Sequence, residues 1–369
     1  RLGDRAPVDD AGPGPAEVLL AIAETPAYRS ALAVARITAE MTGFARDLTN
    51  TPSSVKSPAW LADEMVATAR RRADVTVDVR EPDRLAEEGF GGLLAVGGGS
   101  VAGPRLVEID WHPAGATRHV ALIGKGITFD TGGISIKPRD GMKLMRKDMA
   151  GAAAVVAATV GAALLRVPVR VTAVVALAEN MVSGSAFRPG DVIRHYDGST
   201  SESTNADAEG RLVLADALSY AVERLRPDLL VDLATLTGAN AVALGKRTAA
   251  LYSDSDDLAN QLAAAAGQAG ELLWRMPLPA DYLEYLASDI ADRLSSPDRG
   301  AGSVVAALYL REFTGDRRDR WAHLDMSAPS WADATDGELT RGASGWGVRT
   351  LLRWLLTLAG GEPATTLSA

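Results

Sequence analysis

Cysteine is absent from this 369-residue chain, histidine occurs only four times, and aromatic residues make up 5%. Without cysteine the protein can have no disulfide framework, no thiolate nucleophile and no thiolate metal site. Basic residues are in the minority, with 38 Lys and Arg against 47 Asp and Glu, so the formal net charge is −9. This balance disfavours nonspecific binding to nucleic acid and to anionic membranes. The composition is compatible with a cytoplasmic protein.

Long uncharged apolar runs are scarce as well. Residues 149–165 form the one stretch that could be mistaken for a membrane span, and it lies between Asp148 and Arg166. It is at the short limit for crossing a bilayer and is only weakly hydrophobic because alanine dominates it. We therefore predict a buried helix there. No secretory signal peptide is recognisable, and the chain begins with Arg1 rather than Met, so we expect a further segment upstream.

The four histidines are the usual candidates for zinc ligands, but none has a partner at ligand spacing such as i and i+4. His112 and His119 flank a predicted turn, His195 lies in a predicted loop, and His323 precedes a predicted strand that ends near Met326. We expect these histidines to be structural or exposed. Any metal site should therefore consist mainly of carboxylates, which suit the harder divalent ions Mn²⁺ and Mg²⁺ as well as Zn²⁺.

What the sequence does contain is a row of charged residues at alternate positions in 205–212, NADAEGRL. In an extended segment, Asp207, Glu209 and Arg211 would point to the same side and the intervening alanines away from it. Two carboxylates aimed at one point repel each other unless a cation lies between them. The pattern predicts a metal site just before a helix.

A second group of polar residues follows the apolar run 120–123, which is typical of a buried parallel strand. Lys125 and Asp130 would lie at or beyond the carboxyl end of this strand, where open α/β sheets bind their ligands. Glycines at 132 and 133 allow the backbone to approach a ligand closely. Asp148 then opens the long predicted helix.

Segments 124–137, 145–151 and 205–212 together resemble the signature blocks of the leucyl (cytosol) aminopeptidase family, which are dinuclear metal exopeptidases. The resemblance extends from about Ala45 to Arg349. Two departures are visible: Ala206 stands where the family usually has Thr, and Ala150 where it usually has Gly. Neither departure removes a ligand.

The resemblance implies a set of five metal ligands for two divalent ions, Zn²⁺ or Mn²⁺ with Mg²⁺ as a further candidate. Asp130 and Glu209 would bridge the ions, Lys125 and Asp148 would complete the tighter site, and Asp207 the more exchangeable one. Lysine ligates only as the neutral amine, so Lys125 should be uncharged when metal is bound. Taken singly, Asp148 could be a helix N-cap, and Asp207 and Glu209 could complement a helix dipole. Their joint occurrence in the family's order favours the metal site.

The resemblance also implies catalytic roles for Lys137 and Arg211. The two ions would share a water molecule, lower its pKa, and bind the substrate's free amine and scissile carbonyl. The ammonium of Lys137 would stabilise the tetrahedral oxyanion. Arg211 cannot act as a base, and the family reading is that it holds a bicarbonate that transfers the proton to the leaving amine.

The pocket for the first substrate residue is implied by resemblance at Met145, Thr235, Leu236 and Gly238, with Ala343 as a further part of its wall. A methionine and small residues suggest an apolar pocket suited to Leu or Met side chains. The alternative is that Leu236 merely lies at the end of a core strand.

Strand-like and helix-like segments alternate along the chain. Candidate strands at 170–177 and 229–235 flank a candidate helix at 212–224. This alternation predicts an α/β fold, a three-layer sandwich in which helices flank a mostly parallel central sheet.

The resemblance divides the chain into a linker and a catalytic part. We expect 1–44 to be a linker and helix leading from an N-terminal domain that is not present in the chain, and 45–369 to be the catalytic metallopeptidase domain. Within the linker, 9–15 is rich in Pro and Gly and should be irregular, and a helical pattern runs from Val34 toward Phe44.

The expected function is removal of an apolar first residue from peptides with a free N-terminus, by a homohexamer of two stacked trimers. One alternative is an aminopeptidase dedicated to trimming one precursor peptide. Another is a dinuclear phosphoesterase, in which Lys137, Arg146 and Arg211 would bind phosphate. A binding protein with a vestigial site, including one with a nucleic-acid role, fits the acidic chain and the intact ligand set less well.

Overall fold

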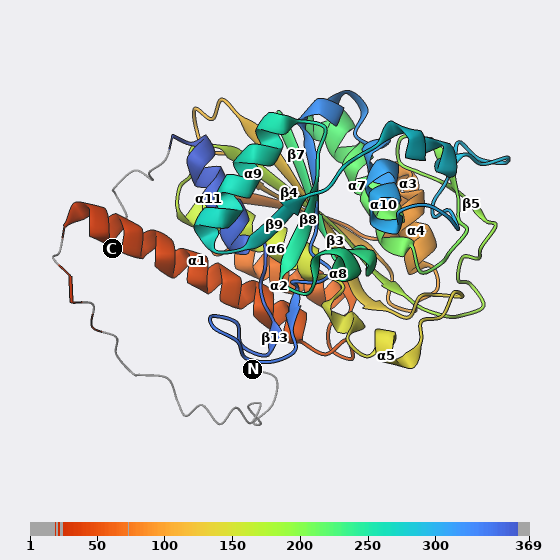
Figure 1. Cartoon of the computed structure of the whole chain (residues 1–369), viewed down its shortest axis with the longest axis horizontal. Coiled ribbons are helices and arrows are strands. Elements are labelled where there is room, and N and C mark those ends of the chain that lie inside the picture. Colours follow the sequence, from red (N-terminus) through yellow and green to blue (C-terminus); the bar gives the residue numbers. More distant parts are fainter. Residues whose placement is uncertain (1–18, 20, 23–24, 73, 361–369) are drawn as a thin grey trace.

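The computed structural model of the protein describes residues 19, 21–22, 25–72 and 74–360 (Figure 1). The stretch 9–15, which we expected to be irregular, lies outside the described residues. An eight-stranded sheet forms the centre, in the strand order β1-β2-β4-β3-β7-β11-β8-β9. Its strands are β1 (Val75–Arg80), β2 (Arg105–Trp111), β3 (His119–Asp130), β4 (Arg170–Asn180), β7 (Leu229–Ala234), β8 (Thr248–Tyr252), β9 (Leu272–Arg275) and β11 (Trp321–Asp325).

The middle of the sheet is parallel. Strand β3 lies between β4 and β7, and β11 follows β7, all in the parallel sense. Strands β2 and β8 pair with the two outer members of this group in the antiparallel sense. Parallel strands need crossover connections, whose helices bury both faces of the sheet. The predicted α/β sandwich is confirmed: the middle strands are parallel, the pairs β1–β2, β2–β4 and β11–β8 are antiparallel, and the edge pair β8–β9 is parallel.

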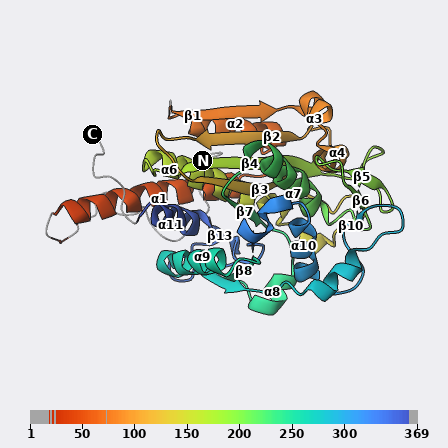
Figure 2. The same ribbon diagram turned by 90° about the horizontal axis from the view of Figure 1, so that it is seen from above.

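Helices cover both faces of the sheet, and the layers can be followed from above in Figure 2. One face carries α1 (Pro26–Asn50), α2 (Pro58–Ala69), α6 (Ala150–Leu164), α9 (Asp256–Ala269) and α11 (Val348–Leu358). The other carries α3 (Pro82–Glu88), α4 (Gly91–Gly97), α7 (Glu209–Tyr220) with the π-helical turn η2 (Ala221–Leu225), and α10 (Gly302–Arg311). Each face encloses an apolar core.

The remaining elements are short. The helical ones are α5 (Arg139–Met142), η1 (Met145–Lys147), α8 (Ala239–Leu244), η3 (Ala280–Leu286) and η4 (Gly315–Arg320). Three strands form a small second sheet, β5 (Val192–Arg194), β6 (Thr200–Glu202) and β10 (Arg293–Leu294). Strands β12 (Trp331–Ala332) and β13 (Gly342–Ala343) form a two-stranded ribbon.

Helix α6 is the apolar helix predicted at 149–165, and its burial is confirmed. Within the described residues, the stretch Arg139–Leu164 is long and apolar enough to cross a membrane, but 89% of its most apolar window is buried inside the protein. Small residues let α6 approach the sheet closely, because a Cβ atom on Gly151 would lie 2.2 Å from the carbonyl oxygen of Leu233 on β7. Helix α6 is therefore a core helix packed to high density.

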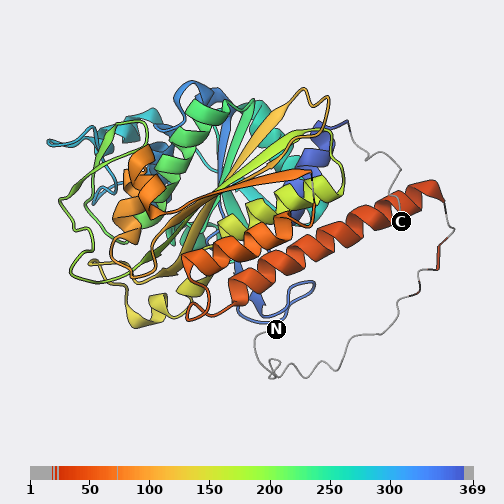
Figure 3. The same cartoon turned by 180° about the vertical axis from the view of Figure 1, so that it is seen from behind.

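Helix α1 contains the helical pattern predicted toward Phe44 and extends beyond it in both directions. Its fully buried residues all lie in the C-terminal half, which packs against α6 and α11. Figure 3 shows the N-terminal half projecting past the other helices. The helix passes residue 44 without interruption. The division into 1–44 and 45–369 stays a prediction.

Candidate metal centre

The five predicted ligands converge at the carboxyl edge of the parallel strands. Lys125 and Asp130 lie on β3, and Asp148 directly follows the η1 turn. Asp207 and Glu209 lie at the N-terminal end of α7. All five line one cleft with a volume of about 260 Å³. This is the edge at which open α/β sheets bind ligands.

The stretch 205–212 is not extended, so the prediction that strand alternation aligns Asp207, Glu209 and Arg211 is wrong. The side-chain oxygen of Asn205 accepts a hydrogen bond from the N–H of Asp207 at 2.9 Å, which closes a turn. Asparagine favours such turns because its side chain competes for nearby backbone N–H groups. Helix α7 then begins at Glu209. The two carboxylates meet through a turn and a helix start instead of through a strand.

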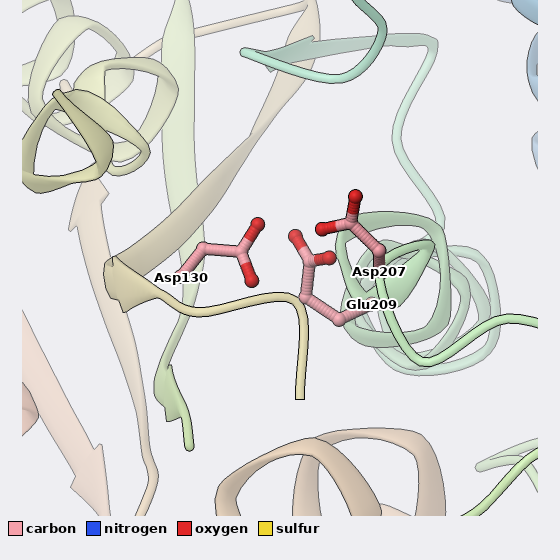
Figure 4. A group of neighbouring side chains, drawn as sticks. All are labelled: Asp130, Asp207 and Glu209. Carbon is pink, nitrogen blue, oxygen red and sulfur yellow. The ribbon is translucent and has the colours of Figure 1, made fainter. Parts of the chain in front are cut away.

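Three carboxylates form the centre of the cluster. Asp130, Asp207 and Glu209 each offer an oxygen within 4.8 Å of the others, and Figure 4 shows the side chains pointing toward one another. The Oε2 atom of Glu209 is buried and has no hydrogen-bond partner among the described residues. A buried carboxylate oxygen without a partner is costly, and a divalent cation would satisfy it. The residues present therefore fit a metal ion.

Lys125 reaches into the cluster from the middle of β3. Its Nζ lies 2.8 Å from Oδ2 of Asp148 and 2.8 Å from Oε1 of Glu209, and it donates to the carbonyl of Thr235 at 3.1 Å. The side chain crosses Gly210, where a Cβ atom would lie 2.6 Å from Cε of Lys125. The glycine at 210 thus leaves room for the lysine beside the first turn of α7.

Lys137 closes the other side of the cluster. Its Nζ lies 2.6 Å from Oδ2 of Asp130 and forms a second ion pair with Asp207. The side chain is 14% exposed and lines the cleft. Its ammonium is therefore buried beside carboxylates while keeping contact with the cleft.

The charges of the cluster shift each other's pKa values. Burial, together with neighbouring carboxylates, raises the pKa of Glu209 to about 7 and that of Asp207 to about 6. Burial also raises the pKa of Asp148. Although burial alone would lower them, the surrounding carboxylates hold the pKa values of Lys125 and Lys137 above the ordinary value for lysine. Strongly shifted pKa values of this kind cluster at functional sites.

Asp130 is oriented by two donors on its other oxygen. Oδ1 accepts hydrogen bonds from the N–H of Gly132 and from Nδ2 of Asn180, both at 2.8 Å. Gly132 has a φ of 85°, and a Cβ atom there would lie 2.6 Å from the carbonyl of Ser135. Asn180 was not identified from the sequence, because β4 runs three residues beyond the predicted strand 170–177.

Asp148 does not cap α6. The helix begins at Ala150 after Met149, without a side-chain cap. Instead, Oδ1 of Asp148 accepts a hydrogen bond from Oγ1 of Thr235 at 2.7 Å, and its other oxygen meets Lys125. The N-cap alternative for Asp148 is therefore not supported, and its side chain is directed into the cleft.

The residues implied for the substrate pocket are not all in one place. Met145, Thr235, Leu236 and Gly238 line the cleft. Ala343 does not line it; this residue is fully buried on β13, where its strand pairs with β12.

The cleft also has charged and aromatic walls that the sequence analysis did not identify. Trp331 on β12 lines the cleft, as do Lys147, Lys246 and Asp333. Lys246 and Asp333 form an ion pair, and Nζ of Lys147 donates to the carbonyl of Ser327 at 2.8 Å. Lys147 lies within the 145–151 segment, whereas no motif marks Trp331, Lys246 and Asp333, which are far from it in the sequence. The cleft thus has charged as well as apolar walls.

Arg211 follows Glu209 by two residues in the first turn of α7, and its charge interacts with that of Glu209. It is nearly buried, and its Nη1 donates to the carbonyl of Ser295 at 2.7 Å. Its Nε has no hydrogen-bond partner among the described residues. The guanidinium does not line the cleft.

The histidines have the structural or exposed positions that we predicted. His195 is buried and bonded to Asp216 at 2.9 Å, and His112 is exposed. His323 is bonded to Asp232 at 2.5 Å. Contrary to the prediction, His323 lies within strand β11 instead of before it.

Comparison with known proteins identifies the family of the chain. The model of the cytosol aminopeptidase family, catalytic domain, matches residues 43–352. The chain is 50% identical over 334 residues to a probable cytosol aminopeptidase of Leifsonia xyli subsp. xyli, covering 87% of this chain and 66% of the relative. It is 51% identical over 318 residues to one of Micrococcus luteus, covering 83% and 61%. The chain thus spans just under two thirds of the length of these relatives.

A solved structure gives the same result. The bottromycin maturation enzyme BotP in complex with Mn matches with a TM-score of 0.87 and 44% identity, covering 91% of this chain and 73% of that chain. The family model spans most of the sequence, and the likeness in fold and the likeness in sequence point to the same family. The chain therefore belongs to the cytosol aminopeptidase family, whose catalytic domain it contains.

Proposed function

We propose that the protein is a metal-dependent aminopeptidase that hydrolyses the first peptide bond of peptides with a free N-terminus. Membership of the cytosol aminopeptidase family supports this class of reaction. The observation that carries the proposal is the meeting of Asp130, Asp207 and Glu209 within 4.8 Å, with one buried Glu209 oxygen lacking a partner. Such a cluster suits a hydrolytic metal site.

The five clustered residues are assigned as ligands of two divalent ions. Asp130 and Glu209 would serve both ions, Lys125 and Asp148 would complete the tighter site, and Asp207 the more exchangeable one. When bound, the ions supply Lewis acidity and lower the pKa of a water molecule. Oxygen-rich ligands suit Mn²⁺ and Mg²⁺ as well as Zn²⁺, and the BotP structure contains Mn. Lys125 can ligate only as a neutral amine, so metal binding must expel its proton.

Lys137 and Arg211 are assigned to catalysis. Ion pairs with Asp130 and Asp207 hold the ammonium of Lys137 at the cleft, where it can stabilise the negative charge that develops on the scissile carbonyl oxygen. Arg211 is proposed to hold a bicarbonate, which would transfer a proton to the leaving amine. In support, the buried Nε of Arg211 has no partner among the described residues and could donate to an anion.

The substrate is proposed to carry an apolar first residue, Leu or Met, which would lie against Met145, Leu236 and Gly238. A dedicated role in maturing one precursor peptide is the second candidate, favoured by the likeness to the maturation enzyme BotP. Turnover of a panel of dipeptides distinguishes the two. Comparable turnover of many Leu- and Met-initiated dipeptides supports the broad role, and turnover of only one or two supports the dedicated one.

A phosphoesterase is less well supported. The guanidinium of Arg146 lies over the ring of Trp331 at 4.8 Å, and Arg211 donates to a backbone carbonyl. Neither arginine lines the cleft, so the basic groups are not gathered around one position for phosphate. A phosphomonoester assayed beside leucyl anilide tests this alternative.

The main experiment compares leucyl anilide with N-acetyl-leucyl anilide in the presence of Mn²⁺ or Zn²⁺. The first should be cleaved and the second should be inert, because an acylated nitrogen has a delocalised lone pair and coordinates a metal poorly. Comparable cleavage of both substrates would point to an endopeptidase or amidase and would overturn the exopeptidase assignment. Loss of all activity after chelation is the matching control for metal dependence.

We also propose a cytoplasmic homohexamer without membrane or nucleic-acid partners. Family resemblance supports the assembly, and the names of the relatives support the location. Light scattering tests the assembly. A particle mass near six times the chain mass of 38.6 kDa is expected, and a mass near one chain would contradict it.

A further inference from the structure

Asp325, the last residue of β11, has a buried carboxylate that accepts five hydrogen bonds. Oδ1 accepts from the N–H groups of Leu236 and Ser327, both at 3.1 Å. Oδ2 accepts from the N–H of Thr237 at 3.0 Å, from its Oγ1 at 2.7 Å, and from Nδ2 of Asn240 at 2.7 Å. Backbone and polar groups thus satisfy the side chain, which forms no ion pair with the described residues.

Most of these donors belong to the 235–238 loop, which follows β7. Strands β7 and β11 are parallel neighbours, and Asp325 is in register with Ala234, the last residue of β7. The carboxylate therefore lies beside the point where the chain leaves the sheet. Backbone N–H groups in such a loop have no strand partner, and a buried carboxylate is a strong acceptor for them.

The same loop touches the proposed metal ligands and the cleft. Oγ1 of Thr235 donates to Asp148 at 2.7 Å, and its carbonyl accepts from Lys125 at 3.1 Å. Leu236 and Gly238 line the cleft. A displacement of the loop would therefore move Thr235, which contacts two of the proposed ligands, together with part of the pocket wall.

We infer that Asp325 is a positioning residue that holds the 235–238 loop, and that through the loop it sets both the affinity of the Lys125–Asp148 metal site and the selectivity for the first substrate residue. The selectivity part rests on the proposed aminopeptidase function, whereas the metal part does not. Asp325 lies on the far side of the loop from the cleft lining and is assigned no contact with substrate.

The test is Asp325→Asn. Asparagine has one acceptor oxygen, and its amide group would face donors, so at least two of the five hydrogen bonds are lost in either orientation. The matched control is Asp232→Asn. The carboxylate of Asp232 is also fully buried, and it contacts Nε1 of Trp321 at 2.7 Å and Nδ1 of His323 at 2.5 Å. Within the part of the chain that the structure describes, it forms no hydrogen bond with the 235–238 loop.

For Asp325→Asn we expect Mn²⁺ binding, measured by calorimetry, to weaken by about tenfold or more, as is typical for residues that orient metal ligands. The ratio of kcat/KM for leucyl over alanyl anilide should fall by a similar order. Asp232→Asn should leave both quantities near wild type even if its melting temperature falls as much. If Asp325→Asn lowers only the melting temperature, Asp325 is merely structural and the inference is wrong.

Two further arms keep the result decisive. If Asp325→Asn does not fold, Thr237→Val removes one donor to Asp325 with little change in shape, and it should shift metal affinity and selectivity in the same direction by a smaller factor. No shift in Thr237→Val would then overturn the inference. If the wild-type protein binds Mn²⁺ but cleaves no anilide, the proposed function fails while the metal titration still tests Asp325.

Discussion

Lys56 offers a test of how the fold holds the segment before Asp148. The side chain is fully buried, and its Nζ donates to the carbonyls of Leu48 at 2.8 Å, Thr49 at 3.1 Å and Arg146 at 2.7 Å. The first two carbonyls belong to the last turn of α1, where a helix has no internal donors left. We predict that Lys56→Met lowers the free energy of unfolding, by an amount that grows with pH.

Two opposing effects set the magnitude. Burial lowers the pKa of Lys56 from 10.5 to about 7, so at pH 7 the replacement relieves a cost of about 4 kcal/mol for burying or deprotonating the amine. Against this, the neutral amine has two N–H donors, so the replacement leaves two buried carbonyls without a donor, at about 2 kcal/mol each. The two effects therefore nearly cancel at pH 7.

Raising the pH reduces the cost of burying or deprotonating the amine, but the replacement still leaves the carbonyls without their donor. The unfolded chain holds the lysine proton up to pH 10.5 and the folded chain only to about pH 7, so the contribution of Lys56 to stability is lost as pH falls between these values and gained as pH rises. At pH 9 the cost falls to about 2 kcal/mol, so the gap between wild type and Lys56→Met should be about 2 kcal/mol, whereas it is close to zero at pH 7.

Urea unfolding followed by circular dichroism at pH 7 and pH 9 measures both gaps. Lys143→Met is the control, because Lys143 is exposed and its pairing with Asp140 should be worth less than about 1 kcal/mol at either pH. A gap for Lys56→Met that stays constant from pH 7 to pH 9 would show that the buried ammonium keeps its proton. A variant more stable than wild type at pH 9 would show that the three carbonyls do not need the donor.

Three predictions concern the cluster itself. Glu209→Gln should lose bound metal and leucyl-anilide activity together, because a neutral amide bridges two cations poorly; metal analysis showing wild-type content with full turnover would refute the bridging role. Lys137→Ala should keep its metal while kcat falls by about 100-fold or more, and an unchanged kcat would remove Lys137 from the mechanism. Mn²⁺ affinity should fall by about 10,000-fold from pH 7.5 to 5.5: about 100-fold because protons compete for Glu209 and Asp207, whose pKa values are raised to about 7 and 6, and about 100-fold more because Lys125, whose pKa is raised, must release its proton; a flat calorimetric profile would contradict this.

The sequence was sufficient to predict the long elements and the cluster. Helix α6 is predicted to within a residue at each end because alanine-rich apolar runs of that length have few other uses in a folded chain. The meeting of the five proposed ligands could be predicted because they occur in contiguous motifs. Strand β3 was underestimated, since 124–130 contains Gly, Lys and Thr, and pairing with β4 as far as Asp130 and with β7 at Gly124 holds it extended.

Other parts depend on contacts that no local pattern encodes. Asn180 meets Asp130 from 50 positions away, and Asp325 meets Thr237 from 88. Lys56 and Arg146 are 90 positions apart. Each of these polar residues is unremarkable in its own segment. The failure of strand alternation at 205–212 has a different cause, a local turn closed by the Asn205 side chain.

The two lysines explain how four carboxylates can share one buried cleft. Without metal, the site contains four carboxylates that can each carry a negative charge: Asp130, Asp148, Asp207 and Glu209. The ammonium groups of Lys125 and Lys137 neutralise two of these charges through ion pairs within 3 Å. If Lys125 gives up its proton when two divalent ions bind, the charges of the site sum to one positive unit, carried in effect by Lys137. The negative charge that develops on the substrate's carbonyl oxygen would then bring the site to neutrality. An arginine at 125 could not serve, because it would remain charged beside the ions.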